Sequence, residues 1–233
     1  MPRTIVERTR RVYDALASVY PVSTYLFHSR AHARALRHSG IRDGMRVLEV
    51  ATGSGEMFKR LVRENPNGTT FGLDLSPNMA AHSLRRARQE CPEAVAHCGA
   101  VDVRSLPFQA SSFDAVMCCY LLELLSQEDI RLTLREIRRV LRKGGRFSLV
   151  VIGQNVGFFN QMYKVAGTLV PAFWGRQVET SAPEMIREAG FHVVKDEFVR
   201  QGFYPSRVLV AENGVHRNGH RNGHLNGHLN GHG

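Results

Sequence analysis

The chain has 233 residues, of which 43% are hydrophobic and 8% aromatic, as is typical of a soluble globular protein long enough to bury one core. The charged N-terminus lacks the apolar core of a signal peptide, and no stretch reaches the length of a membrane-spanning helix, so a cytoplasmic location is expected. The four cysteines show no C-x-x-C spacing, so neither a zinc site nor a disulfide framework is indicated.

The formal net charge is +10, which is unusual for an enzyme that acts on a small molecule. Residues 212–233 contribute two arginines and one glutamate, a net of +1, so residues 1–211 carry +9 and the basicity belongs to the folded part. A basic surface attracts nucleic acid, an anionic membrane or an acidic substrate. The alternative is that the charge serves solubility alone.

Two helices are predicted before the first strand. Residues 3–20 combine an apolar stripe with several arginines, and Pro21 is expected to end this basic amphipathic helix. A second helix spans roughly residues 28–38 and ends at Gly40. Residues 1–40 are therefore predicted to form an N-terminal helical cap.

Strands and helices then alternate, which indicates a parallel α/β sheet. The predicted strands span residues 46–51, 69–73, 94–98, 113–119, 147–152, 191–199 and 207–211. The predicted helices span residues 56–64, 77–90, about 126–143 and 181–189. Ser76 and Ser181 are expected to cap the helices that follow them, and Glu184 completes a capping box with Ser181.

Two segments depart from this alternation. Residues from about 153 to 176 form an apolar insertion, which is either a helix packed on the sheet or a lid beside a lipophilic substrate. From Asn213 a four-residue repeat rich in His, Asn and Gly cannot build a core, so residues 213–233 are predicted to be disordered. The main domain then spans residues 41–212.

The most informative stretch is Val47–Gly55, Val-Leu-Glu-Val-Ala-Thr-Gly-Ser-Gly, where a strand breaks into a glycine turn and a helix follows. Glycines permit backbone conformations closed to other residues, and the free amides at the start of the helix point into the turn. The dinucleotide pattern G-x-G-x-x-G fails, because Phe58 stands at the third glycine position. The stretch predicts a site for a small molecule; the alternative is an ordinary turn between a strand and a helix.

Polar or small residues lie at or just after the ends of four predicted strands, at Glu49–Gly55, Asp74–Leu75, Asp102–Val103 and Cys119–Tyr120. In open parallel sheets, ligands bind outside the carboxyl ends of the strands, where the strand order reverses. We therefore expect these four loops to meet at one site.

Together with Arg-Val-Leu-Arg-Lys-Gly-Gly-Arg-Phe at residues 139–147, these loops closely resemble the class I S-adenosylmethionine (SAM) methyltransferases of the type that includes the ubiquinone/menaquinone C-methyltransferases (methyltransferase type 11). The resemblance covers roughly residues 12–211. It implies a Rossmann-like, doubly wound sheet of seven strands in the order 3-2-1-4-5-7-6, with the last strand antiparallel and helices on both faces. It also implies an enzyme that uses SAM as cofactor and releases S-adenosylhomocysteine.

Matching positions imply roles for individual residues. Asp74 corresponds to the carboxylate that accepts hydrogen bonds from both ribose hydroxyls. Leu75 and Met79 would flank the adenine, while Asp102 would accept from the adenine amino group beside the Val103 amide. The complete implied cofactor set is Glu49, Ala51, Thr52, Gly53, Gly55, Asp74, Leu75, Met79, Asp102, Val103 and Cys119.

Within this set, Glu49 is implied to orient the loop and the ammonium group of the cofactor. For each acid, the alternative is a helix cap or a surface charge. The segment at residues 12–20 resembles the part of the family that covers the cofactor and shapes the acceptor pocket. Two departures leave the acceptor open: Pro21 stands where the family usually has Asp, and residues 120–125 are Tyr-Leu-Leu-Glu-Leu-Leu where the quinone enzymes carry a polar segment.

The sulfonium of SAM is already a strong electrophile, so the protein's chief tasks are to align a nucleophile in line with the methyl carbon and to exclude water. No metal is expected. A phenol or an activated carbon must lose a proton, which a base can accept. The candidates are Tyr20, His28, His32, Tyr120 and Glu123, and for each the alternative is a structural role.

The basic N-terminal helices and the apolar insertion favour a small lipophilic acceptor met at an anionic membrane, with the protein peripheral at the inner surface. The expected acceptor is a phospholipid amine such as phosphatidylethanolamine, or a quinone precursor. Alternatives are a methyltransferase of a soluble secondary metabolite, a basic RNA-binding protein or RNA methyltransferase, and a protein that binds SAM without turnover. The sequence lacks an aromatic-and-basic recognition motif, which disfavours nucleic acid as the partner.

Overall fold

The computed structural model describes residues 20–153, 178–202 and 204–214, with side chains from residue 28 onward. The predicted N-terminal helix of residues 3–20, the apolar insertion and the His/Asn/Gly tail lie almost wholly outside these described residues.

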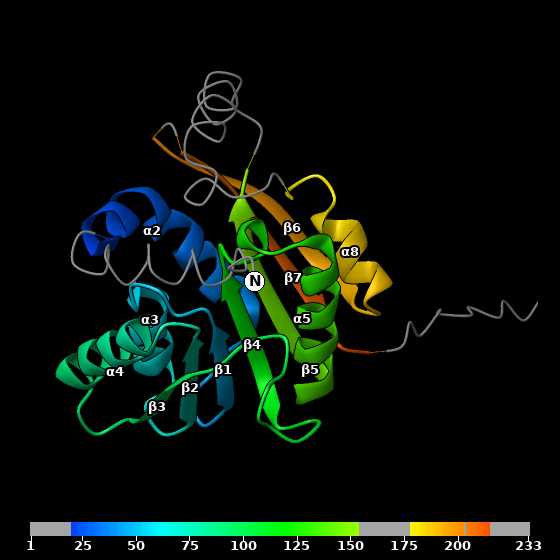
Figure 1. The fold of residues 1–233 in the computed structure, drawn as a ribbon. Coiled ribbons are helices and arrows are strands. Elements are labelled where there is room, and N and C mark those ends of the chain that lie inside the picture. Colours follow the sequence, from blue (N-terminus) through cyan, green and yellow to red (C-terminus); the bar gives the residue numbers. More distant parts are fainter. Residues whose placement is uncertain (1–19, 154–177, 203, 215–233) are drawn as a thin grey trace, which may run out of the picture.

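A seven-stranded sheet organises the described chain (Figure 1). Its strands are β1 (Arg46–Val50), β2 (Thr69–Asp74), β3 (Val95–Ala100), β4 (Phe113–Cys119), β5 (Leu141–Ile152), β6 (His192–Gln201) and β7 (Tyr204–Glu212). They lie in the order β3-β2-β1-β4-β5-β7-β6, and β7 runs antiparallel to both β5 and β6, which confirms the predicted order. Because the chain moves outward from β1 to β2 and then returns to β4, the strand order reverses between β1 and β4.

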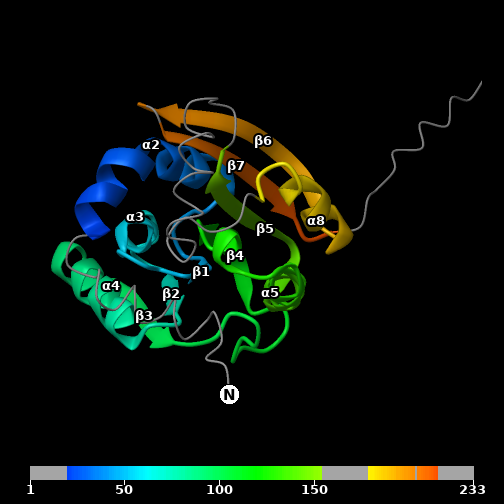
Figure 2. The same ribbon diagram turned by 45° about the horizontal axis from the view of Figure 1, so that its top comes forward.

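Helices cover both faces of the sheet. They are α2 (Tyr20–Ser39), α3 (Glu56–Glu64), α4 (Pro77–Glu90), α5 (Gln127–Val140) and α8 (Ala182–Glu188), with a short 3-10 helix, η1 (Leu122–Leu124). Figure 2 shows α2, α3 and α4 on one face and α5 and α8 on the other.

The core is divided by the sheet because consecutive strand residues point to opposite faces. In β1, Leu48 packs with Leu134 and Ile137 of α5, whereas its neighbour Val47 packs with Leu61 of α3 and Ala35 of α2. The central strands are therefore apolar at nearly every position in sequence, and the helices bury their apolar stripes against the two faces of the sheet.

The structure moves several predicted boundaries. The second predicted helix, α2, begins at Tyr20 instead of about residue 28 and contains Pro21 in its first turn, where the missing amide costs no hydrogen bond. Strand β5 begins at Leu141 instead of Phe147, because Leu141 pairs with Phe113 before a shift in register. Helix α5 accordingly ends at Val140.

Of the two predicted helix caps, one is confirmed and one is wrong. The hydroxyl of Ser76 accepts from the Met79 amide at 3.2 Å, which confirms the cap of α4. The prediction for Ser181 is wrong: this residue has a helical conformation, and its hydroxyl donates to the Val178 carbonyl at 3.1 Å. Because the backbone of Ser181 is already helical, its side chain is not directed toward the free amides of the first helical turn.

No helix among the described residues is both long and apolar enough to cross a membrane.

Candidate cofactor and acceptor site

A pocket opens at the carboxyl ends of β1, β2, β3 and β4, next to the reversal of strand order. All members of the predicted cofactor set except Gly55 line this pocket, and so do His28, His32 and Tyr120. Tyr20 begins α2, and its side chain is outside the described part. The structure thus brings four loops distant in sequence to one place, as predicted.

The turn after β1 holds three residues in the left-handed region: Ala51 at φ 61°, Gly53 at φ 49° and Gly55 at φ 73°. A non-glycine residue such as Ala51 pays of the order of 1 kcal/mol or more for this conformation, and such strain is concentrated at functional sites. The amide of Thr52 donates to the Leu73 carbonyl at 3.0 Å, which ties the turn to β2.

The two glycines of the turn face different surroundings. A Cβ atom on Gly53 would meet nothing within 4 Å, so the pocket is open beside this backbone. A Cβ atom on Gly55 would lie 2.8 Å from the Cα atom of Ser83 in α4. Gly55 therefore permits close packing of the turn on α4, and the structure does not place it in the pocket lining.

Asp74 joins the glycine turn to the start of α4. Its Oδ2 accepts from the Gly53 amide at 2.8 Å, and its Oδ1 accepts from the Ser76 amide at 2.9 Å. Asp74 also lines the pocket, and each oxygen of a carboxylate can accept more than one hydrogen bond.

Glu49 is only 1% exposed, and its Oε2 has no hydrogen-bonding partner in the described part of the chain. Burial, followed by the negative charge of Asp74, raises the pKa of Glu49 well above its ordinary value. The hydroxyl of Thr52 is also buried without a partner there. Unpaired buried acceptors beside a pocket are suited to a ligand that carries hydrogen-bond donors and positive charge, such as the ammonium group of SAM.

Asp102 is held by Arg104, a pocket residue that the sequence analysis missed. The Arg104 Nη2 donates to Asp102 Oδ2 at 2.6 Å, its Nε contacts both carboxylate oxygens at 3.0 and 3.1 Å, and its Nη1 donates to Asp129 at 2.9 Å. These hydrogen bonds lower the pKa of Asp102 although burial opposes them. The Asp-x-Arg spacing, with the Arg104 amide on Asp102 Oδ1 at 3.0 Å, is a signal that could have revealed the pair.

Three further residues form what we call the aromatic wall of the pocket: His28 and His32, one turn apart on α2, and Tyr120 after β4. The His28 and Tyr120 rings stack at 4.1 Å, and the His32 ring lies 6.0 Å from each of them. Tyr120 has a φ of 55°, and its hydroxyl forms a 2.8 Å hydrogen bond with Ser206 of β7, which fixes the ring.

Both histidines of the wall are uncharged near neutral pH. Burial lowers the pKa of His28 to about 4. Burial also lowers the pKa of His32 well below its ordinary value, with smaller contributions from His28 and Arg60. Burial raises the pKa of the nearby Cys119 thiol, so this pocket residue is an uncharged thiol as well.

Apolar side chains complete the lining, and the sequence analysis did not predict them. They are Met57, Val101, Leu121, Leu124 and Leu125. Across the described residues, no cluster of His, Cys, Asp and Glu side chains has the form of a metal site. The lining of the pocket thus combines carboxyl groups and the backbone of the glycine turn with an uncharged aromatic wall.

Comparison with known proteins adds the following similarities. Residues 47–145 match the family model for a methyltransferase domain. The 2-phytyl-1,4-naphtoquinone methyltransferase of Trichormus variabilis is 29% identical over 149 residues, which are 64% of this chain and 63% of that protein. The demethylmenaquinone methyltransferase of Staphylococcus aureus is 26% identical over 222 residues, or 90% of each protein. A chain in the complex between the Haloferax volcanii Trm112 methyltransferase activator and the putative methyltransferase shares the fold, with a TM-score of 0.71 and 21% identity over 89% of this chain and 98% of that one.

The sheet order and the pocket at the ends of β1 and β4 are those expected of a Rossmann-like methyltransferase fold. The match at residues 47–145 and the two relatives support a class I SAM-dependent methyltransferase of the type that resembles the quinone C-methyltransferases, with SAM as its cofactor.

Proposed function

We propose that the protein transfers the methyl group of SAM to a small lipophilic acceptor of the quinone type. When bound, SAM supplies a methyl group already activated by its sulfonium. The remaining tasks, which are binding, orientation and exclusion of water, fall to the residues of the pocket.

Asp74 would accept from the ribose hydroxyls, because it lines the pocket and its carboxylate presents two acceptor oxygens. Glu49 would receive the ammonium group, since its buried Oε2 lacks a partner among the described residues. The side chains of Leu75 and Met79 and the Val103 backbone line the space assigned to the adenine.

The aromatic wall is the feature from which we infer the class of acceptor. The carboxyl and guanidinium groups of the described lining belong to Glu49, Asp74, Asp102 and Arg104, and none of them is part of the wall. The wall presents rings on which a flat aromatic acceptor can stack, and it contains no carboxylate that would pair with an ammonium group. The two quinone methyltransferase relatives support the same choice.

A lipophilic acceptor would reach the pocket from a membrane, and α2 is suited to that contact. His28 and His32 lie on its inner face, while Arg30, Arg34 and Arg37 are exposed on its outer face. One helix therefore joins the acceptor wall to a basic surface, which supports peripheral contact with an anionic membrane.

The test incubates the purified full chain with SAM labelled in its methyl group and with two acceptors in parallel, 1,4-naphthoquinol and phosphatidylethanolamine in vesicles. We expect a labelled methylnaphthoquinol by mass spectrometry and no labelled lipid. Label found only in phosphatidylethanolamine would overturn the acceptor class. Failure of S-adenosylhomocysteine to bind the folded protein in calorimetric titration would overturn the proposed cofactor contacts.

A further inference from the structure

His32 is a buried side chain of the pocket with unused hydrogen-bonding capacity. It is 3% exposed, and neither of its ring nitrogens has a hydrogen-bonding partner in the described structure. Leaving buried polar atoms unpaired costs free energy, so such atoms in a folded protein need an explanation. A donor carried by a ligand would satisfy His32, because this residue lines the pocket.

The surroundings of His32 fix what that ligand group can be. A neutral imidazole offers one nitrogen as an acceptor, and that nitrogen can take a proton. Burial, with a smaller contribution from Arg60 on α3, lowers the pKa of His32, so the ring is uncharged and one of its nitrogens is an acceptor. A hydroxyl on an uncharged ring is a donor that suits both the nitrogen and the aromatic rings around it.

We propose, resting on the proposed function, that His32 accepts the proton of a ring hydroxyl on the methyl acceptor, and that His28 and Tyr120 position the acceptor ring. The stacked His28 and Tyr120 rings provide an aromatic surface, which the hydrogen bond between Tyr120 and Ser206 holds in place. Neither the family match nor the relatives' names assign a role to these residues.

The proposed step balances as follows. A ring carbon adjacent to the hydroxyl forms a bond to the methyl group of SAM, while the carbon–sulfur bond breaks and its electron pair stays on sulfur. In the same step the O–H bond of the acceptor breaks and its proton moves to the free nitrogen of His32. Burial lowers the pKa of His32, but the hydroxyl becomes far more acidic as the ring gives electrons to the new bond, so this weak base can accept the proton. The ring carbon then loses its hydrogen as a proton, and His32 returns its proton to the oxygen. One proton is released for each methyl group transferred.

A binding experiment tests the hydrogen bond without turnover. The full chain, saturated with S-adenosylhomocysteine, is titrated with 1-naphthol and with 1-methoxynaphthalene, whose ring oxygen carries no hydrogen. We expect the wild type to bind 1-naphthol about tenfold more tightly, the worth of one hydrogen bond. His32→Phe should abolish this preference by weakening only 1-naphthol, whereas the control His97→Phe, at an exposed residue of β3 outside the pocket lining, should leave it intact. An unchanged preference in His32→Phe would overturn the proposal.

A turnover experiment separates proton acceptance from positioning. Glutamine can accept a hydrogen bond but cannot take up a proton at neutral pH, so His32→Gln should retain the preference for 1-naphthol and lower kcat with 1,4-naphthoquinol about a hundredfold. Turnover of His32→Gln at the wild-type rate would refute the role as proton acceptor. If wild-type protein does not methylate 1,4-naphthoquinol, the proposed function fails, and the preference for 1-naphthol still decides whether His32 binds a hydroxyl. His32→Gln also provides the binding test if His32→Phe does not fold.

Discussion

At the scale of single residues, Asp74 joins two loops and a ligand site through one carboxylate. In Asp74→Asn, an amide group replaces one oxygen and cannot accept from the Gly53 or Ser76 amide, so one contact with the loops is lost together with the charge. Because hydrogen bonds to a charged group are each worth about 1.5–3 kcal/mol, we expect S-adenosylhomocysteine to bind roughly 30- to 100-fold more weakly in calorimetric titration.

A matched control for this change exists at the other end of the sheet. Asp43 lies before β1; its Oδ1 accepts from the Gly44 and Asn67 amides at 2.9 and 2.8 Å, and its Oδ2 accepts from the Asn67 side-chain amide at 2.6 Å. Asp43→Asn should therefore also remove a charge and weaken a turn, but leave cofactor affinity unchanged. Equal affinities in both variants would show that Asp74 does not contact the cofactor.

Glu123 makes stability depend on pH. Its Oε1 accepts from the Ile152 amide at 2.6 Å, and burial raises its pKa from 4.5 to about 7. Because the folded state holds the proton more tightly, the stabilisation is fully present below about pH 4.5 and is lost as the pH rises through 7. The loss amounts to about 3 kcal/mol, from roughly 1.4 kcal/mol for each unit of pKa.

The comparison with Glu123→Gln isolates this effect, since glutamine can still accept from Ile152 and does not ionise. In urea denaturation, the variant and the wild type should have similar free energies of unfolding near pH 4.5, and the variant should be more stable at pH 8.5. Parallel curves across this range would contradict the assigned role of Glu123.

Several residues of the site could be predicted from sequence because their signals are local. Glu49 is the residue before the end of β1 and Asp74 ends β2, each beside a turn, and a parallel sheet brings such positions together. Arg104 was missed because charged residues in loops are usually solvated, and only the fold shows that this one reaches both Asp102 and Asp129. The distinct surroundings of Gly53 and Gly55 likewise depend on α4, which the motif does not contain.

At the scale of elements, substitutions of Gly53 and Gly55 should affect different properties: Gly55 mainly the packing of the glycine turn on α4, and Gly53 mainly the binding of the cofactor. Gly55→Ala combines a left-handed conformation with a 2.8 Å approach to the Ser83 backbone, so it should destabilise the protein by more than about 2 kcal/mol. Gly53→Ala should lower the free energy of unfolding by only about 1 kcal/mol, because its methyl group enters open space. Since that space is the pocket, the affinity for the cofactor should fall more than tenfold.

Gly44→Ala is the control for these two variants. Gly44 has a φ of 85°, nothing lies within 4 Å of its Cβ position, and it is outside the pocket lining. It should therefore show only the backbone cost of about 1 kcal/mol in urea denaturation and unchanged binding in calorimetry. A Gly53→Ala variant with the affinity of Gly44→Ala would place the cofactor away from this turn.

Element boundaries were predictable where a local signal marks them. Ser76 before Pro77 locates the start of α4 because both residues favour a helix N-terminus. The start of β5 had no such signal: Leu141 continues the apolar stripe of α5 in sequence, and it is in a strand because it pairs with Phe113. Tertiary pairing therefore overrode the helical pattern at this residue.

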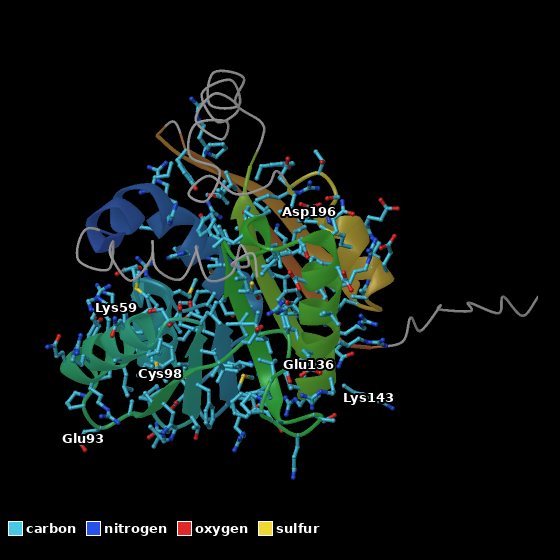
Figure 3. All side chains as sticks on the ribbon, in the orientation of Figure 1. Lys59, Glu93, Cys98, Glu136, Lys143 and Asp196 are labelled. Carbon is cyan, nitrogen blue, oxygen red and sulfur yellow. The ribbon has the colours of Figure 1, made fainter. Side chains whose placement is uncertain are left out.

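At the scale of the whole molecule, the structure shows where part of the +10 net charge lies. Arg30, Arg34 and Arg37 are exposed on the face of α2 opposite the pocket wall, and α4 exposes Arg85 and Arg88 on its own surface. Figure 3 shows charged side chains at other places of the described part as well, with Glu93 at one edge and Lys143 at another. Net charge alone therefore does not single out one face of the molecule.

If α2 is the face that meets a membrane, the double variant Arg30→Gln, Arg37→Gln should bind anionic vesicles about 30-fold more weakly in flotation assays, because each arginine near such a surface contributes about 1 kcal/mol. The double variant Arg85→Gln, Arg88→Gln removes the same charge from α4 and should bind nearly as well as the wild type. High salt should release the wild type, because screening shortens the reach of the charges. Equal losses in both double variants would mean that only the total charge matters, and equal flotation with uncharged vesicles would exclude an electrostatic contact altogether.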